Sequence, residues 1–216
     1  MRILTMVLTM FLAASLQHAA AHDGTAQQTD ETKKAIEGIV GAPAPVPAPG
    51  SEAKAHKYFT DLPVLTQHGD ELRFYSDVLE GRIVVVTLFY TECTGMCPLT
   101  NQKLAEMQDL LGDAMGRDYF FVSVSLDPET DRPDVLKEYA EKFGARDGWL
   151  FLTGEEADLK LITRRLGQAD DNIAAHNPFF MLGNVPRAHW ARQRPNMPAE
   201  AIVARLRFMS DNLPTQ

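Results

Sequence analysis

The chain has 216 residues and a formal net charge of −8 at pH 7. This length suits one ordinary domain with additional segments, and 45% hydrophobic and 23% charged residues are typical of a globular protein. The acidic balance argues against binding to nucleic acid, which calls for a basic surface. Two cysteines are too few for a small scaffold held together by disulfides.

Residues 1–21 have the pattern of a secretory signal peptide. Arg2 precedes a short apolar run, Ile3–Leu16, and small residues at 19–21 offer a cleavage site. The run is shorter than the roughly 20 residues that span a bilayer. We therefore expect export to the periplasm or cell envelope, with membrane association only if this segment stays uncleaved as an anchor.

Residues 22–55 are polar at first and then rich in proline and alanine. The stretch GAPAPVPAPG at 41–50 favours an extended, polyproline-type spacer that packs no core. We predict a flexible tether over 22–55 and one folded domain over 56–216.

The first half of this domain predicts a βαβ unit preceded by a hairpin. Short apolar runs on either side of a polar turn indicate a β-hairpin over 62–74. The continuous runs at Ile83–Tyr90 and Tyr119–Leu126 are typical of strands buried on both faces of a parallel sheet. Between them, apolar residues at helical spacing predict a helix.

The second half predicts further helices and strands. A helix at 136–143 precedes a short strand at 149–152, and Thr153 with Glu156 fits a capping box for the next helix. Two further strands are predicted to pair across Gly183-Asn184, and Pro198 opens a last helix. The fold class is therefore α/β, with a mixed central sheet flanked by helices and a second hairpin near the C-terminus.

The two cysteines, Cys93 and Cys97, lie between the first buried strand and its helix, and Pro98 follows in the first turn. The positive end of a helix lowers the pKa of a thiol. Residues four apart on a helix have Cβ atoms about 5–6 Å apart, whereas a disulfide needs about 3.8 Å. A bridge closing so small a loop also stabilises little, so a purely structural disulfide is a poor explanation of the pair.

Two sulfurs can reach one metal ion with less distortion of the helix. Soft thiolates suit Cu(I), zinc or an iron–sulfur cluster. Two cysteines are too few for a four-cysteine cluster, so further ligands, most plausibly histidine, must come from elsewhere.

Of the six histidines, His176 and His189 fall in the later part of the domain. His176 directly precedes a predicted core strand, where it can approach the cysteines, and roles as ligand or as structural residue both stay open. His189 fits a partly buried structural histidine beside Trp190. The others lie in the leader, in or beside the tether, or in the first turn: His18, His22, His56 and His68.

Several motifs occur in an order that resembles the Sco/SenC family of thioredoxin-fold copper proteins, which serve the assembly of cytochrome c oxidase. The resemblance covers about residues 56–213. Its elements are Phe89-Tyr90-Thr91, the CxxxCP motif Cys93–Pro98, the stretch Ser123–Pro133, Leu136–Tyr139, Leu152-Thr153-Gly154 and the lone His176.

The resemblance implies a thioredoxin-like fold and a copper site made of Cys93, Cys97 and His176. It implies a metallochaperone that binds Cu(I) or Cu(II) and passes copper by ligand exchange to a cytochrome c oxidase subunit or another copper or thiol partner. In the oxidised form the cysteines would be a disulfide, so that redox state gates copper loading.

The chain departs from the family's pattern around these residues. Thr94, Gly95 and Met96 stand between the cysteines, where the family commonly has proline and an acidic residue. Ala175 and Asn177 flank His176 in place of aspartate and serine. These changes remove acidic charge around the site. They could alter its copper affinity, its redox potential and the partner that it serves.

Other side chains near the cysteines are secondary candidates. We expect Met96 to pack against the helix, with a soft thioether ligand as the alternative. Asp127, Glu129 and Asp131 follow the second parallel strand, where they could tune the site or dock a partner; capping and turn formation explains Asp131 equally well.

The alternative function is that of a thiol–disulfide oxidoreductase acting on cysteines of a partner protein, with Cys93 and Cys97 as its redox pair. A cis bond at Asn177-Pro178, opposite the cysteines, would favour it. A thiol peroxidase fits less well, because Thr91 stands two residues before Cys93 and the TxxC spacing is absent.

Overall fold

The computed structural model describes residues 51–168, 172–173 and 178–211. The predicted signal peptide, most of the predicted tether, His176 and the Asn177-Pro178 bond lie outside the described residues. Helix α2 (Ser51–Phe59) begins before the predicted domain boundary, and its Ala55 and Phe59 are buried in the core. In the ranges that the structure describes, no helix is long and apolar enough to cross a bilayer.

The centre of the domain is a seven-stranded mixed sheet in the order β2-β1-β5-β4-β3-β6-β7. Strands β3, β4 and β5 are parallel, and the outer strands pair antiparallel. The strands are β1 (Pro63–Thr66), β2 (Glu71–Arg73), β3 (Ile83–Phe89), β4 (Tyr119–Ser125), β5 (Trp149–Thr153), β6 (Phe180–Asn184) and β7 (His189–Gln193). The predicted fold class, with its βαβ unit and two hairpins, is confirmed.

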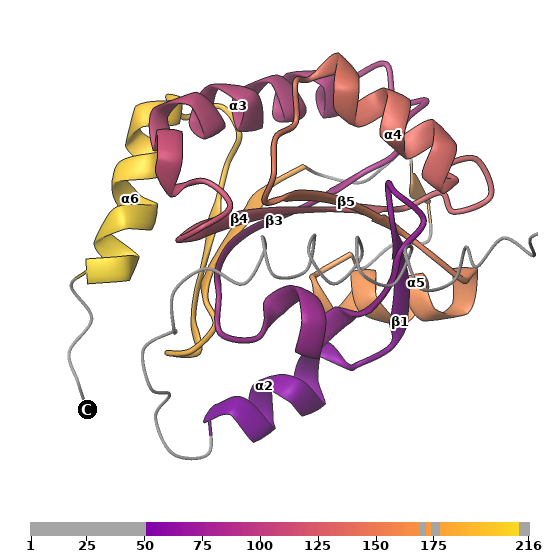
Figure 1. Ribbon diagram of the computed structural model, residues 1–216, viewed down its shortest axis with the longest axis horizontal. Coiled ribbons are helices and arrows are strands. Elements are labelled where there is room, and N and C mark those ends of the chain that lie inside the picture. Colours follow the sequence, from indigo (N-terminus) through magenta and orange to yellow (C-terminus); the bar gives the residue numbers. More distant parts are fainter. Residues whose placement is uncertain (1–50, 169–171, 174–177, 212–216) are drawn as a thin grey trace, which may run out of the picture.

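Helices cover both faces of the sheet (Figure 1). One face carries α3 (Met96–Leu111), α4 (Pro133–Lys142) and α6 (Ala199–Asp211). The other carries α2, α5 (Glu156–Arg165) and a π-helical turn, η1 (Phe74–Leu79). The two layers enclose two separate clusters of buried side chains, one on each side of the sheet.

The sequence of β3 is almost continuously apolar because both faces of this strand are buried. Val85 and Phe89 pack into the cluster under α3, α4 and α6, whereas Val84, Val86 and Leu88 pack into the cluster on the opposite face. Because successive side chains of a strand point to opposite faces, a strand covered on both sides needs apolar residues at almost every position. This central position places the end of β3, where the cysteines follow, in the middle of the sheet edge.

Two local predictions are wrong. Thr153 does not cap α5, because the helix begins at Glu156 after an N-cap Glu155 without a side-chain hydrogen bond. Gly183-Asn184 does not form the hairpin turn but belongs to β6, where Gly183 pairs with Trp190. A Cβ atom at position 183 would lie 2.3 Å from the Trp190 ring, so the glycine makes room for this indole.

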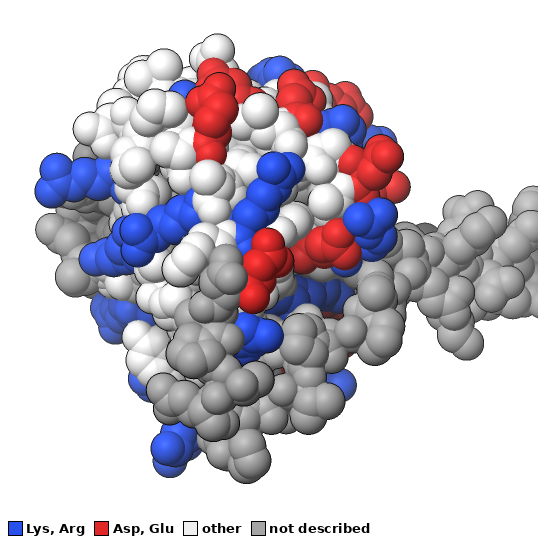
Figure 2. Space-filling model, turned by 90° about the vertical axis from the view of Figure 1, so that its left-hand side faces the viewer, with Lys and Arg blue, Asp and Glu red and all other residues white. Residues whose placement is uncertain are grey.

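Both signs of charge occur on the face that Figure 2 shows: acidic side chains lie at its top, centre and right, and its left-hand part carries basic ones. No single sign covers this face among the residues that the structure describes.

Candidate functional site

The two cysteines lie at the carboxyl end of β3. Cys93 is in the loop that leaves this strand, and Cys97 is in the first turn of α3. Both are free thiols, with exposed fractions of only 9% for Cys93 and 1% for Cys97. They belong to the core cluster under α3, α4 and α6. The end of a central parallel strand is where α/β proteins commonly carry their sites.

The environment of Cys93 favours its thiolate. Burial raises the pKa of this thiol, but hydrogen bonds outweigh it and hold the pKa below the ordinary value. The donors are the thiol of Cys97, the backbone N–H groups of Cys97 and Gly95, and the hydroxyl of Tyr90. A thiolate is the form of cysteine that attacks disulfides and binds soft metals.

Cys97 has the opposite character. Burial, together with the hydrogen bond that its thiol donates to Cys93 and the charge of that neighbour, raises its pKa to about 12. Tyr139 lies close enough to both cysteines to feel their charges; burial is the main reason that its pKa rises to about 12. The pair therefore consists of one activated and one protonated sulfur that share a proton. Cys97 has to lose this proton before both sulfurs bind one metal ion.

A buried carboxylate holds the loop in front of the cysteines. Asp131 is fully buried and accepts hydrogen bonds from the backbone N–H of Thr91 at 3.1 Å and from the Thr91 hydroxyl. Its other oxygen accepts a hydrogen bond from Ser125 at the end of β4. Burial raises the pKa of this carboxyl, while the hydrogen bonds from Ser125 and Thr91 lower it in part. Asp131 thus ties the ends of the two parallel strands together.

The acidic candidates therefore differ in role. Asp131 is a positioning residue for the loop, as turn formation predicts. Asp127 donates its backbone N–H to Ser125 at 2.9 Å, and Glu129 is exposed. Neither has a recorded contact with the cysteines in the described structure, so a direct effect on the sulfurs has no support there.

Three polar side chains around the thiols carry roles that the motifs did not reveal. Tyr90 donates to Cys93. Asn101, fully buried one helical turn after Cys97, donates to the Tyr139 hydroxyl at 3.1 Å, and its own carbonyl oxygen has no partner within the described chain. The i+4 spacing from Cys97 is the signal that could have pointed to Asn101.

The described structure brings the two cysteines together but does not place a histidine beside them. His176 lies outside the described residues. His189 pairs with Asn184, which is opposite Ile83 at the amino end of β3, so it is at the far end of this strand from the cysteines. Within the described ranges, no group of three histidine, cysteine or acidic side chains is arranged to hold a metal ion.

The described chain resumes after His176 at the cysteine end of the sheet. The Thr87 hydroxyl, near the end of β3, donates to the carbonyl of Phe179 at 3.2 Å. Strand β6 then runs antiparallel to β3 toward its amino end. The segment that enters β6 therefore comes from the side on which the cysteines lie.

Met96 does not pack as we expected from the sequence. Its side chain is 44% exposed and belongs to neither core cluster. Thr94 and Gly95 are exposed as well, so the segment between the cysteines faces solvent while the two thiols lie beneath it.

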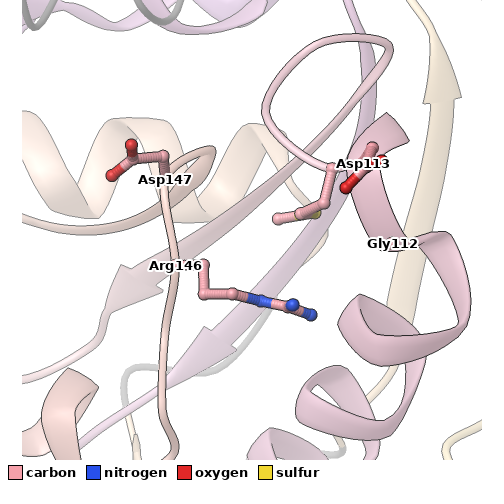
Figure 3. A pocket seen from close by; sticks show the side chains of 5 residues that line it. Gly112, Asp113, Arg146 and Asp147 are labelled. Carbon is pink, nitrogen blue, oxygen red and sulfur yellow. The ribbon is translucent and has the colours of Figure 1, made fainter.

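A surface pocket of about 400 Å³ is lined by Gly112, Asp113, Met115, Arg146 and Asp147 (Figure 3). Its residues precede β4 and β5, so it lies at the amino ends of the parallel strands, opposite the cysteines. Arg146 binds Asp109 at 2.9 Å rather than any residue near the thiols. The pocket is therefore separate from the cysteine site.

Comparisons with known proteins agree on one family. The sequence model of the SCO1/SenC family matches residues 53–207. A SCO2-like protein of Rickettsia felis is 32% identical over 103 residues, which are 48% of this chain and 48% of that protein, so the match spans about half of its length.

Two solved structures share the fold. Arabidopsis thaliana ScoI with copper bound has a TM-score of 0.58 and 19% identity, covering 72% of this chain and 99% of that one. BsSco, described as a member of the Sco family of cytochrome c oxidase assembly proteins with a disulfide switch, has a TM-score of 0.57 and 24% identity. The match covers 72% of this chain and 94% of BsSco. These likenesses support the thioredoxin-like architecture.

Proposed function

This chain belongs to the SCO1/SenC family, and on that premise we propose that it is a copper metallochaperone of the cell envelope. It binds copper through Cys93, Cys97 and His176 and passes the metal to a partner, with a cytochrome c oxidase subunit as the foremost candidate. The observation that carries the proposal is the pair of buried, hydrogen-bonded thiols at the end of β3.

The chemistry of the donors fits copper. Two thiolates are soft ligands that suit Cu(I), and an imidazole added to them suits both oxidation states of copper. Of the structural relatives, Arabidopsis ScoI holds copper and BsSco belongs to a family of oxidase assembly proteins. Export follows from the signal-peptide pattern of residues 1–21.

The assignment of His176 rests on chain connectivity. Only Asn177 separates it from Pro178, and consecutive Cα atoms are about 3.8 Å apart, so its Cα is within about 8 Å of that of Pro178. The segment after Pro178 lies at the cysteine end of β3. This connectivity supports the choice of His176 as the third ligand in the proposal.

Redox gating follows from the same two sulfurs. A Cys93–Cys97 disulfide removes both thiolates and thereby the copper ligands, whereas reduction by an external thiol restores them. Because the thiols already share a hydrogen bond, closing the bond needs only a local change in the first turn of α3.

A second candidate function is that of a thiol–disulfide oxidoreductase. The asymmetry between a thiolate at Cys93 and a protonated Cys97 favours it, since attack by one sulfur and resolution by the other need such a pair. In this reaction the Cys93 thiolate attacks a partner disulfide, and the Cys97 thiolate then releases the reduced partner while a Cys93–Cys97 disulfide forms.

One substitution separates the two functions. In a His176→Ala variant, the copper chaperone loses or weakens its sulfur-to-Cu(II) charge-transfer band while the circular dichroism spectrum stays that of the folded protein. An oxidoreductase keeps its turnover with a protein disulfide in this variant. An unchanged copper spectrum and stoichiometry in His176→Ala would eliminate this histidine as a ligand.

A further inference from the structure

The methionines of the described chain divide into two groups. Five are buried in the two core clusters or packed against them: Met107, Met115, Met181, Met197 and Met209. Met96 is the sixth, and its side chain is 44% exposed outside both clusters. Its sulfur therefore contributes little to the packing of the fold.

Met96 lies at the exposed start of α3, next to the buried Cys97. It is the first residue of α3 and directly precedes Cys97, whose own side chain is almost fully buried. The segment Thr94-Gly95-Met96 is exposed above the pair. Met96 supplies the sole sulfur of this segment.

A thioether at this place suits one oxidation state of copper. It is a soft, neutral donor that selects Cu(I) over harder ions, and it needs no deprotonation to bind. Met96 therefore adds a soft donor on the exposed side of the buried pair.

We propose that the Met96 thioether is a further Cu(I) ligand, on the solvent side of Cys93 and Cys97, through which the metal enters and leaves the site. This inference rests on the proposed copper function. Loading forms the bonds from copper to the Met96, Cys93 and Cys97 sulfurs and releases the Cys97 proton to water. During transfer an incoming ligand of the partner replaces the Met96 sulfur first, and Cu(I) is neither oxidised nor reduced.

Two exposed neighbours provide matched controls. Leu99 is an exposed apolar residue in the same turn of α3, so Leu99→Ala tests whether apolar exposure alone matters. Glu92 is an exposed carboxylate on the other side of Cys93, a harder donor than sulfur, so Glu92→Gln tests for an oxygen ligand. Met96→Leu keeps the size and exposure of the side chain while removing its sulfur.

The test compares reduced wild type, Met96→Leu and both controls by competition for Cu(I) with a chromophoric chelator, and separately for Cu(II). Met96→Leu is expected to weaken Cu(I) binding on the order of tenfold, which is the low end of the affinity loss seen when a side chain that supports a metal site is removed. It should leave Cu(II) binding unchanged. The controls are expected to match the wild type in both titrations.

Selenium absorption spectroscopy of selenomethionine-labelled protein loaded with Cu(I) reads the contact directly. Copper in the selenium environment of the wild type, and its absence in labelled Met96→Leu, is the expected result. Wild-type selenium without a copper neighbour overturns the inference, whatever the affinities are. A Cys93→Ser/Cys97→Ser variant tests the proposed copper function separately from the role of Met96. If this variant binds copper as tightly as the wild type, the copper function of the cysteine pair is wrong.

Discussion

Asp131 accepts two hydrogen bonds from Thr91, one from its backbone N–H and one from its hydroxyl. Thr91 follows Tyr90, the hydroxyl donor to Cys93, so the fully buried Asp131 fixes the start of the loop that carries the first thiol. The motif that contains Asp131 is far from the cysteines in the chain, and this contact explains what it contributes to the site.

Replacing Asp131 should destabilise the protein. Asp131→Ala leaves the Thr91 N–H, the Thr91 hydroxyl and the Ser125 hydroxyl without their acceptor in a buried place. We expect the free energy of unfolding in urea to fall by about 2–4 kcal/mol. Asp131→Asn keeps one acceptor oxygen and should lose less. Asp134→Asn, at a carboxylate that is 76% exposed, is the control and should unfold like the wild type.

The Tyr90 hydroxyl should control the reactivity of Cys93. Tyr90→Phe removes one donor to the thiolate, so the pKa of Cys93 should rise and its alkylation by iodoacetamide near neutral pH should slow. The measurement is the pH dependence of the alkylation rate, with the modified cysteine located by peptide mapping. Tyr58→Phe, which removes an exposed hydroxyl bonded to the Arg165 carbonyl, should change nothing. Equal rates in Tyr90→Phe and wild type would refute this role.

Alkaline pH should destabilise the reduced protein through Cys97 and Tyr139. The folded pKa of each is about 12, above the ordinary values of 9.0 for a cysteine and 10.0 for a tyrosine, which we expect in the unfolded chain. Their contribution to stability is complete below the unfolded pKa and is lost as the pH rises toward the folded pKa. Above the unfolded pKa, each group should cost about 1.4 kcal/mol per pH unit.

Urea unfolding at pH 8 and at pH 11 measures this loss. In Tyr139→Phe the decrease between the two pH values should be smaller than in the wild type, because this ring no longer ionises on unfolding. The variant also loses the hydrogen bond with Asn101, which lowers its stability at both pH values and leaves the difference interpretable. An identical decrease in both proteins would show that Tyr139 ionises as easily in the folded state as in the unfolded one.

A larger side chain at position 183 should destabilise the protein while Trp190 is present. Gly183→Ala places a Cβ atom against the indole and should lower the free energy of unfolding by about 1–3 kcal/mol. In a Trp190→Ala background the same substitution should cost much less, because the ring is gone. A double-mutant cycle measures this coupling, and additive effects would contradict the packing explanation.

The sequence predicts the features that a local pattern determines, and it fails where a feature depends on a tertiary contact. Ile83–Phe89 and Tyr119–Ser125 were recognisable as strands because burial on both faces imposes an unbroken apolar pattern. The turn predicted at Gly183 is wrong, since the lack of a side chain at this position makes room for the tertiary contact with Trp190.

In the candidate site, too, the local sequence predicts some features and misses others. The spacing of Cys93, Cys97 and Pro98 predicts two sulfurs at the start of a helix, which the structure has. The raised pKa of Cys97 depends first on burial against distant elements, which no local pattern encodes, whereas the lowered pKa of Cys93 comes mainly from its neighbours Cys97 and Gly95. Exposure of Met96 was also not predictable, because the residue type alone favours packing.

In the proposed site, Cys93 and Cys97 bind copper only when both are reduced. The decisive measurement is a copper titration of the reduced and the oxidised protein, run side by side and followed by metal analysis after desalting. We expect one copper ion per reduced chain, with a sulfur-to-metal charge-transfer band when Cu(II) is added, and no copper retained by the disulfide form. Equal copper binding by both forms, or none by the reduced one, would contradict this proposal.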